Sequence, residues 1–208
     1  MPTRASRPAV PVILSLLFSA AAMADHVVAA CGPELLKNVP PRAPAAASVR
    51  DFVRAAVSMD DDGRELLIRE ELLAGNLPDA LRHTVAVTIA GIETTRAGTR
   101  IVVCVLPDYL AIGPDGNSLI APMRLATALS VARSFGFVLP TPTIVDAIYG
   151  QAGTKLKPQP LPAGSWMRST EYYLRHNALI VSQRDATRCM RTPTRSLLAT
   201  RRISYSGG

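Results

Sequence analysis

The sequence has few features that would place it in a common functional class. The apolar run over 8–24 is short for a membrane-spanning helix, and no other segment reaches the roughly 18 consecutive apolar residues that such a helix needs, so we expect no transmembrane span in the mature chain. The signatures of serine hydrolases, zinc proteases, dinucleotide-binding folds and P-loops do not occur, and no repeat of fixed period is visible. Nothing in the sequence therefore predicts a cofactor.

Cysteine is scarce, and its three positions do not form a metal-binding pattern. Cys31, Cys104 and Cys189 are widely spaced, without the C-x-x-C or Cys/His spacing of zinc sites, so no metal site is predicted. Cys104 lies in the apolar run 101–106 and is expected in a buried strand. Two alternatives follow: a Cys31–Cys104 disulfide in an oxidising compartment, or a buried Cys104 with a Cys31 that is unpaired or lipidated.

The chain carries more positive than negative charge, but the excess lies at its two ends. Its 208 residues include 23 Lys and Arg against 16 Asp and Glu, and 48% of them are apolar, which suits one domain with its own core. Of the net charge of +7, Arg4 and Arg7 contribute two and residues 185–208 contribute four. Residues 25–184 keep a net charge of only +1, so we do not expect a nucleic-acid partner.

The first 24 residues are typical of a secretory signal peptide. Arg4 and Arg7 precede an apolar run over 8–24 that ends in the small-x-small sequence Ala-Met-Ala, and cleavage there would leave Asp25 as the N-terminus. We therefore expect a secreted or periplasmic protein. The alternative is that the apolar run is retained as an N-terminal anchor.

A second cleavage pattern overlaps the first. Residues 28–31 (Val-Ala-Ala-Cys) resemble a lipobox, in which Cys31 would carry a lipid anchor. Asp25 and His26 interrupt the apolar run just before this box, where a lipoprotein signal stays apolar. Export without a lipid is therefore the preferred interpretation.

The rest of the chain divides into a Pro- and Ala-rich linker over 25–47, an α+β domain over 48–184, and a basic tail over 185–208 that we expect to be disordered.

Apolar residues at steps of three and four predict helices over about 48–57, 64–74, 122–135, 142–156 and 166–184. Alternation and turn signals predict strands over 84–89, 100–106, 109–113 and 118–121. The connections between these strands are too short for crossovers, so we predict a small antiparallel meander packed with the helices. In the last helix, the predicted buried stripe is Met167, Leu174, Ala178 and Val181.

Three consecutive acids, Asp60, Asp61 and Asp62, precede the second predicted helix. They could ligate calcium, but the ligand spacing and the closing Glu of an EF-hand are absent. We predict instead that they cap the N-terminus of this helix, where negative charge is favourable.

Five spaced motifs occur in order between residues 63 and 184. They are E-E-L-L-A-G-N-L-P-D (70–79), P-D-Y-L-A-I-G (107–113), L-P-T with V-D-A-I-Y (139–149), K-L-K-P-Q-P (155–160) and H-N (176–177). In this respect the chain resembles a family of secreted bacterial proteins, and the resemblance implies export but no particular activity. It also implies an ordered, His-containing C-terminal part, whereas this sequence departs from the pattern at Arg184. We therefore expect a truncated or frameshifted end, which an intact downstream reading frame in the gene would support.

Five side chains are candidates for chemistry. Asp79 and His83 are four residues apart, so on one helical turn the carboxylate could orient the imidazole as a base. Asp108 follows a strand, Asp146 lies early in a helix, and His176 lies on the last helix. The alternatives are a helix-end role for His83, a helix-dipole role for Asp146, and simple exposure for His176.

Two function classes fit these features, and the sequence leaves both open. One is a binding or interaction domain of the cell envelope or the extracellular space. The other is a secreted hydrolase of a cell-wall or extracellular polymer, such as peptidoglycan, that uses His and Asp. A histidine within hydrogen-bond reach of one of the three aspartates in a cleft would favour the hydrolase, and histidines that lie apart on open surface would favour the binding domain.

Overall fold

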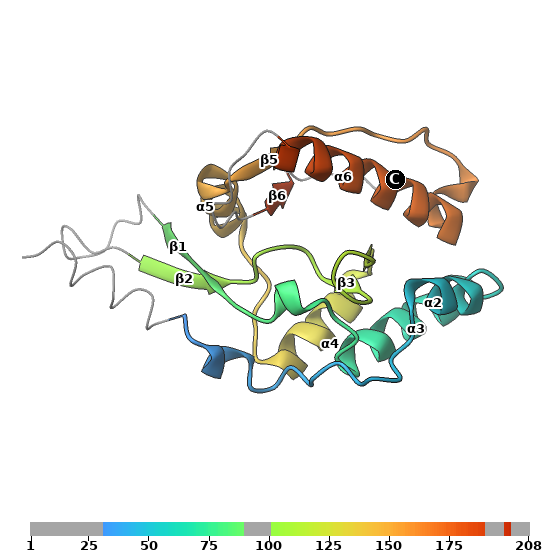
Figure 1. Cartoon of the computed structure of the whole chain (residues 1–208), viewed down its shortest axis with the longest axis horizontal. Coiled ribbons are helices and arrows are strands. Elements are labelled where there is room, and N and C mark those ends of the chain that lie inside the picture. Colours follow the sequence, from blue (N-terminus) through green and yellow to red (C-terminus); the bar gives the residue numbers. More distant parts are fainter. Residues whose placement is uncertain (1–30, 90–100, 190–197, 201–208) are drawn as a thin grey trace, which may run out of the picture.

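The computed structural model describes residues 31–89, 101–189 and 198–200 of the chain (Figure 1). Its helices are α2 (Val49–Ala56), α3 (Asp61–Leu73), α4 (Leu125–Phe135), α5 (Pro142–Gln151) and α6 (Thr170–Cys189), with short 3-10 helices η1 (Pro33–Leu36), η2 (Asp79–Leu81) and η3 (Ser165–Arg168). Its strands are β1 (Val85–Ile89), β2 (Ile101–Val105), β3 (Ala111–Ile112), β4 (Leu119–Ile120), β5 (Thr154–Leu156) and β6 (Leu198–Thr200). The predicted α+β class is confirmed. The predicted signal peptide and most of the predicted tail lie outside the described residues.

Side-chain caps explain where three of the helices begin. Ser48 caps α2 by accepting a hydrogen bond from a backbone N–H three residues on, at 3.2 Å, and Asp60 caps α3 in the same way at 2.8 Å. Thr141 caps α5, where Pro142 supplies the first helical residue. The predicted capping role of the acidic run is thus confirmed for its first member.

The strands pair in twos. β1 and β2 are antiparallel, with Val85 opposite Val105 and Ile89 opposite Ile101, and β3 and β4 form a second antiparallel pair. The predicted small antiparallel sheet is present, but as two separate pairs, because β2 does not pair with β3 anywhere in the described chain as a continuous meander would require. Pro107 and Asp108 lie in the connection between β2 and β3.

The chain keeps regular structure beyond Arg184, where the disordered tail was expected to follow. α6 continues to Cys189, and residues 198–200 form β6, which pairs in parallel with β5. Within the described residues, these two stretches of the expected tail form regular elements. Neither Gly nor Pro occurs between Arg184 and Cys189, so nothing in the local sequence ends the helix earlier. No helix within the described ranges, α6 included, combines the length and the apolarity that are needed to cross a bilayer.

Two groups of buried apolar side chains stabilise the domain. The larger lies between α2, α3, α4 and the β3–β4 pair, and consists of Phe52, Ala56, Ile68, Leu72, Leu77, Ile112, Leu119, Ala121, Val131 and Phe135. The smaller is centred on Val87 of β1 and Ala152 at the end of α5. The elements are in turn linked by packing of α5 on β1 and of α6 on β4 and β5.

The buried face of α6 is not the predicted one. Leu174, Ala178 and Val181 of the predicted stripe are exposed, whereas Tyr172 and Ile180 are buried. The helix packs on the edges of short strands rather than on a broad apolar layer, so its inward face combines apolar side chains with hydrogen-bonding ones.

Three carboxamide side chains complete the hydrogen bonding of extended backbone. In each, the oxygen accepts from a backbone N–H and the nitrogen donates to a backbone carbonyl, as a neighbouring strand would do. Gln151 of α5 bonds the backbone of Thr88 in this way, and Gln183 of α6 bonds that of Lys157. Asn177 of α6 accepts from the N–H of Ile120 and donates to the carbonyl of Ser118. They satisfy backbone groups that two-stranded pairing leaves free, and they hold α5 and α6 on the strands.

A disulfide joins the N-terminal segment to the β1–β2 pair. Cys31 is bonded to Cys104 of β2, with their Cα atoms 5.4 Å apart. Of the two alternatives for these cysteines, the structure therefore contains the disulfide. A sulfur in a disulfide cannot also carry a lipid, so this state of the protein is incompatible with a lipid anchor at Cys31.

The predicted linker packs along the domain over the part that is described, residues 31–47. Arg42 Nε donates to the side-chain oxygen of the buried Asn76 at 2.8 Å. Gly75 lies so close to this segment that a Cβ atom there would be 2.2 Å from the carbonyl oxygen of Pro40, and its φ of +76° also favours glycine. One of the motifs that carry the family resemblance therefore contacts the N-terminal segment.

Candidate functional site

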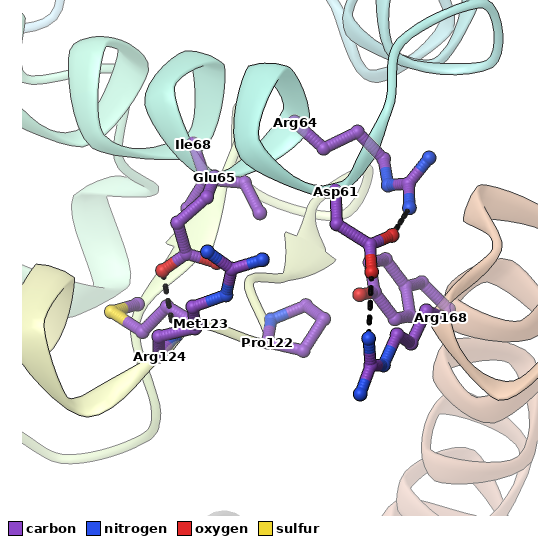
Figure 2. Close-up of a pocket in the computed structure, with 9 residues that line it drawn as sticks. Asp61, Arg64, Glu65, Ile68, Pro122, Met123, Arg124 and Arg168 are labelled. Atoms are coloured by element: carbon purple, nitrogen blue, oxygen red, sulfur yellow. Dashed lines mark hydrogen bonds and ion pairs between the residues drawn. The ribbon is translucent and has the colours of Figure 1, made fainter.

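A cleft of about 540 Å³ lies where α3, the residues before α4 and the start of α6 meet. Its apolar lining is Ile68, Pro122 and Met123. Its polar lining is Asp61, Arg64, Glu65, Arg124, Arg168 and Tyr173. Figure 2 shows the charged side chains in two groups, one on each side of Pro122.

The acidic run at the start of α3 supplies three different contacts. Asp60 caps the helix, Asp61 forms ion pairs with two arginines, and Asp62 forms an ion pair with Arg124 at 2.5 Å. Within the described residues, no group of three or more His, Cys, Asp or Glu side chains could hold a metal ion. The three carboxylates are instead directed to the helix end and to arginines.

The first charged group in the cleft consists of Asp61, Arg64, Arg168 and Tyr173, and is called the Asp61 group below. Asp61 pairs with Arg64 of its own helix and, at 3.1 Å, with Arg168 of η3, so two guanidinium groups share one carboxylate. Only 11% of the Arg64 side chain is exposed, whereas 80% of the Arg168 side chain is exposed. With both arginines and Asp61 ionised, this group carries a net charge of +1.

Arg64 leaves one of its donors without a protein partner. Its Nη1 donates to the carbonyl of Met59 at 2.7 Å and its Nη2 donates to Asp61. Its Nε is buried and has no hydrogen-bond partner among the described residues. Burial raises the pKa of the Tyr173 hydroxyl, and the positive charge of Arg64 opposes that rise. Tyr173 therefore contributes a neutral hydroxyl beside a partly unsatisfied guanidinium.

The second charged group joins α3 to the start of α4. Glu65 accepts a hydrogen bond at 2.6 Å from the backbone N–H of Arg124, the N-cap residue of α4, so it satisfies a donor at the start of that helix. The bond from Arg124 to Asp62 raises the pKa of the Arg124 guanidinium. These contacts fix one side of the cleft.

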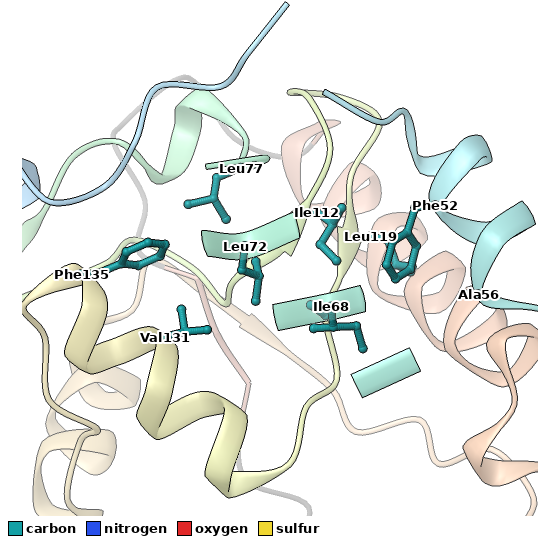
Figure 3. Close-up of a cluster of buried hydrophobic side chains, with 10 residues drawn as sticks. Phe52, Ala56, Ile68, Leu72, Leu77, Ile112, Leu119, Val131 and Phe135 are labelled. Atoms are coloured by element: carbon teal, nitrogen blue, oxygen red, sulfur yellow. The ribbon is translucent and has the colours of Figure 1, made fainter. Parts of the chain in front are cut away.

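Ile68 connects the cleft to the main core. It lines the cleft yet is only 2% exposed, and Figure 3 shows it in the buried cluster with Leu72 and Leu119. Asp61, Glu65 and Ile68 follow one another along α3 at steps of three and four, which places them on one face of the helix. The charged groups are therefore held on a helix that the core itself anchors.

The chemistry of the cleft suits binding. Among the described residues, its lining contains three arginines, one of which (Arg124) is paired with Asp62 just outside it, two acids, and no histidine, serine or cysteine. Guanidinium groups bind carboxylates and phosphates through parallel hydrogen bonds. The cleft can thus hold a polar chain that carries oxyanions, over an apolar lining.

Asp79 and His83 do not form the predicted pair. The 3-10 helix η2 ends at Leu81, so the four-residue spacing does not place the two side chains on one α-helical turn. Asp79 forms an ion pair with Arg82 at 3.3 Å instead, and its side chain is 80% exposed. His83 is exposed.

Asp108 is partly buried and holds α6. Its carboxylate forms an ion pair with Arg184 at 2.7 Å, with 16% and 18% of the two side chains exposed, and also accepts a hydrogen bond from the backbone N–H of Tyr109. Burial raises the pKa of the Asp108 carboxyl, and the charge of Arg184 opposes that rise. These contacts support a structural role for Asp108 between the end of β2 and α6.

The two remaining candidates lie on separate helices. Asp146 is exposed on α5. His176 is half-buried on α6, next to Asn177, whose side chain bonds the backbone at β4. Among the described residues, no hydrogen bond or ion pair joins His83 or His176 to any of the three candidate aspartates, and none of the five candidates lines the 540 Å³ cleft.

A second cleft, of about 470 Å³, lies beside the N-terminal segment. Its lining includes Asp79, Arg42 and Arg82. Arg82 donates to the carbonyls of Pro40 and Gly75, and Arg42 donates to a side chain and two carbonyls. The guanidinium groups here are engaged in docking the N-terminal segment, so this cleft offers fewer free donors than the first.

The arginines of the first cleft were not predicted as site residues. Arg64, Arg124 and Arg168 are scattered along the sequence, and no local spacing relates them. The acidic run before α3 is the sequence feature that indicates this cleft, because Asp61 and Asp62 form ion pairs with all three arginines in the folded chain. No protein-family model, curated protein or solved structure matches this chain.

Proposed function

We propose that the chain is an exported bacterial protein that acts as a binding domain at the cell envelope or outside the cell, and that its ligand is a cell-wall or extracellular polymer. The binding surface is the 540 Å³ cleft beside α3. This proposal joins the export features of the sequence to the chemistry of the cleft, and it takes binding as the function in preference to hydrolysis.

Export is supported at two places in the chain. The first 24 residues have the basic, apolar and small-residue regions of a signal peptide. The Cys31–Cys104 disulfide is the kind of cross-link that persists in oxidising compartments and is rare in the cytosol. The two features are independent, because one lies in the sequence before the domain and the other within it.

Binding is supported by the composition of the cleft, which is the observation that carries the proposal. Arg64 of α3, Arg124 at the start of α4 and Arg168 of η3 line this cleft, while both candidate histidines lie elsewhere and, in the described chain, form no hydrogen bond or ion pair with a candidate aspartate. A hydrolase of the predicted type would need a histidine and a carboxylate in hydrogen-bond reach within a cleft. The arrangement of donors favours recognition of an anionic polymer such as peptidoglycan, whose peptides carry carboxylates.

The proposal is tested with the full chain expressed in a Gram-negative host and purified from the periplasm. Mass spectrometry is expected to find Asp25 as the first residue. The purified protein is then sedimented with protein-free peptidoglycan sacculi and, as a control, with an uncharged polysaccharide. We expect the protein to pellet with the sacculi but not with the uncharged polysaccharide. We also expect it to release no soluble wall fragments. Retention in the cytoplasm, absence of binding, or release of fragments would contradict the proposal.

A further inference from the structure

We infer that the Asp61 group is a subsite for a singly charged oxyanion, a carboxylate or a phosphodiester, carried by the ligand of the cleft. This inference rests on the function proposed above and makes it specific. The group consists of Asp61, Arg64, Arg168 and Tyr173, all of which line the cleft, and its three charged members lie on one side of Pro122 (Figure 2).

The charge of the group is the first reason. Arg64 and Arg168 share the single carboxylate of Asp61, so the group itself has one positive charge in excess, whereas Glu65 on the other side of Pro122 bonds the backbone N–H of Arg124. A cation would be repelled by two guanidinium groups, and a neutral ligand would leave the excess charge uncompensated. An anion with one negative charge balances it.

The free donors of the group are the second reason. Arg64 Nε is buried without a partner among the described residues, where a donor is normally satisfied; because the atom is buried, a ligand reaches it only if the side chains around it move. Arg168 donates to Asp61 through Nη1 and is otherwise exposed, so it keeps further N–H groups for a ligand. Tyr173 lines the same cleft and adds a hydroxyl.

The two arginines contribute differently to such a site. Arg64 is held by the carbonyl of Met59 and by Asp61, so its guanidinium is fixed before any ligand arrives. Arg168 comes from η3, a different element, and is 80% exposed. Arg168 can therefore be replaced without opening the interior, and it is the residue to vary.

The experiment is a titration of the full chain with small probes, followed by NMR of the arginine Nε–H groups. The probes are N-acetyl-dialanine with a free carboxylate, the same peptide with a C-terminal amide, and dimethyl phosphate. We expect the Arg64 Nε–H resonance to shift with at least one of the two anions and not with the amide. A response to N-acetyl-dialanine alone assigns the subsite to peptide carboxylates, and a response to dimethyl phosphate alone assigns it to phosphodiesters.

Three variants give the matched comparison. Arg168→Ala is expected to weaken anion binding about tenfold or more, the effect of losing a hydrogen bond to a charged group. Arg168→Lys keeps the positive charge but loses the planar guanidinium. Its affinity for the anion should therefore lie between those of Arg168→Ala and the unmodified chain. Arg133→Ala removes the same charge from an exposed position on α4 that does not line the cleft, and it should bind as the unmodified chain does.

The inference is overturned if neither anion moves the Arg64 signal, if the amide moves it equally, or if Arg168→Ala binds as tightly as Arg133→Ala. Its failure can be separated from that of the proposed function. Sacculus binding without an anion response would overturn the subsite and leave the binding domain. An anion response without binding to sacculi would support the subsite and overturn the proposed ligand.

Discussion

The disulfide gives the clearest stability prediction, because its effect can be calculated before any measurement. Replacing both partners, in a Cys31→Ser/Cys104→Ser variant, removes a cross-link between residues that are 73 apart in the sequence. The main effect is on the unfolded chain, which regains the conformational entropy that the closed loop denied it. For a loop of this size the chain-entropy model gives about 4 kcal/mol.

That amount is large for one domain. Typical unfolding free energies are only about 5–15 kcal/mol, so the variant should lose a considerable part of its stability. The folded state should change less, because the N-terminal segment keeps the bond from Arg42 to Asn76 and the bonds from Arg82 to the carbonyls of Pro40 and Gly75. We therefore expect a folded but less stable variant.

The assay is urea unfolding, followed by circular dichroism, of the exported protein, of the same protein under reducing conditions, and of the double variant. The midpoint should fall similarly in the last two, and the slope with urea should rise because the uncross-linked unfolded chain exposes more surface. Cys189→Ser is the control, since Cys189 is not part of the bridge. Midpoints that do not change on reduction, or three free thiols in the native exported protein, would show that this disulfide does not stabilise the folded chain.

Three further predictions concern the fold. Leu72→Ala should destabilise the domain by about 2–5 kcal/mol, whereas Leu66→Ala, at a site that is 51% exposed, should change stability by about 0.5 kcal/mol or less; equal losses in thermal unfolding would show that α3 is oriented differently. Because burial raises the pKa of Asp108 above 3.8, the stability that this group contributes is present below about pH 4 and is lost as the pH rises through its native pKa. Unfolding free energies measured from about pH 4 to 7 should therefore fall relative to those of Asp108→Asn, and parallel profiles would contradict this. Gln151→Ala removes two bonds to β1 and should cost about 1–2 kcal/mol, with faster hydrogen exchange at the Thr88 amide; unchanged exchange there would argue against the edge contact.

Local chemistry explains which parts of the fold the sequence predicts. Ser48 and Thr141 supply N-cap oxygens at the expected helix starts, and Asp60 caps α3, which begins three residues before the expected start at 64, so all three starts depend on neighbouring residues. The α+β class follows equally from the change between helical and alternating periods. The Cys31–Cys104 bond could only be named as an alternative, because it depends on a contact between segments 73 residues apart.

The features that were missed depend on the tertiary environment. The stripe of Leu174, Ala178 and Val181 has helical spacing, but which face of α6 is buried depends on what that helix meets. It packs on strand edges whose backbone N–H groups donate to the side chains of Asn177 and Gln183. These polar residues therefore face the strands. Period alone cannot predict such a reversal.

The cleft was missed for a similar reason. Asp61, Arg124 and Arg168 come together only when α3, the start of α4 and η3 are packed, and no local pattern in the sequence connects them. Asp79 and His83, by contrast, have a suggestive spacing but are separated by the end of a 3-10 helix. Spacing was therefore a poor guide to the candidate site, and the charge of the acidic run was a better one.

Reversing one charge in the cleft tests directly whether the protein binds its polymer there. Arg168→Glu and Arg133→Glu change the net charge of the protein equally, but only the first residue lines the cleft. In sedimentation with peptidoglycan sacculi, we predict that Arg168→Glu loses at least about tenfold in affinity while Arg133→Glu binds as the unmodified protein does. Equal binding by the two variants would contradict the claim that this cleft is where the protein binds its polymer.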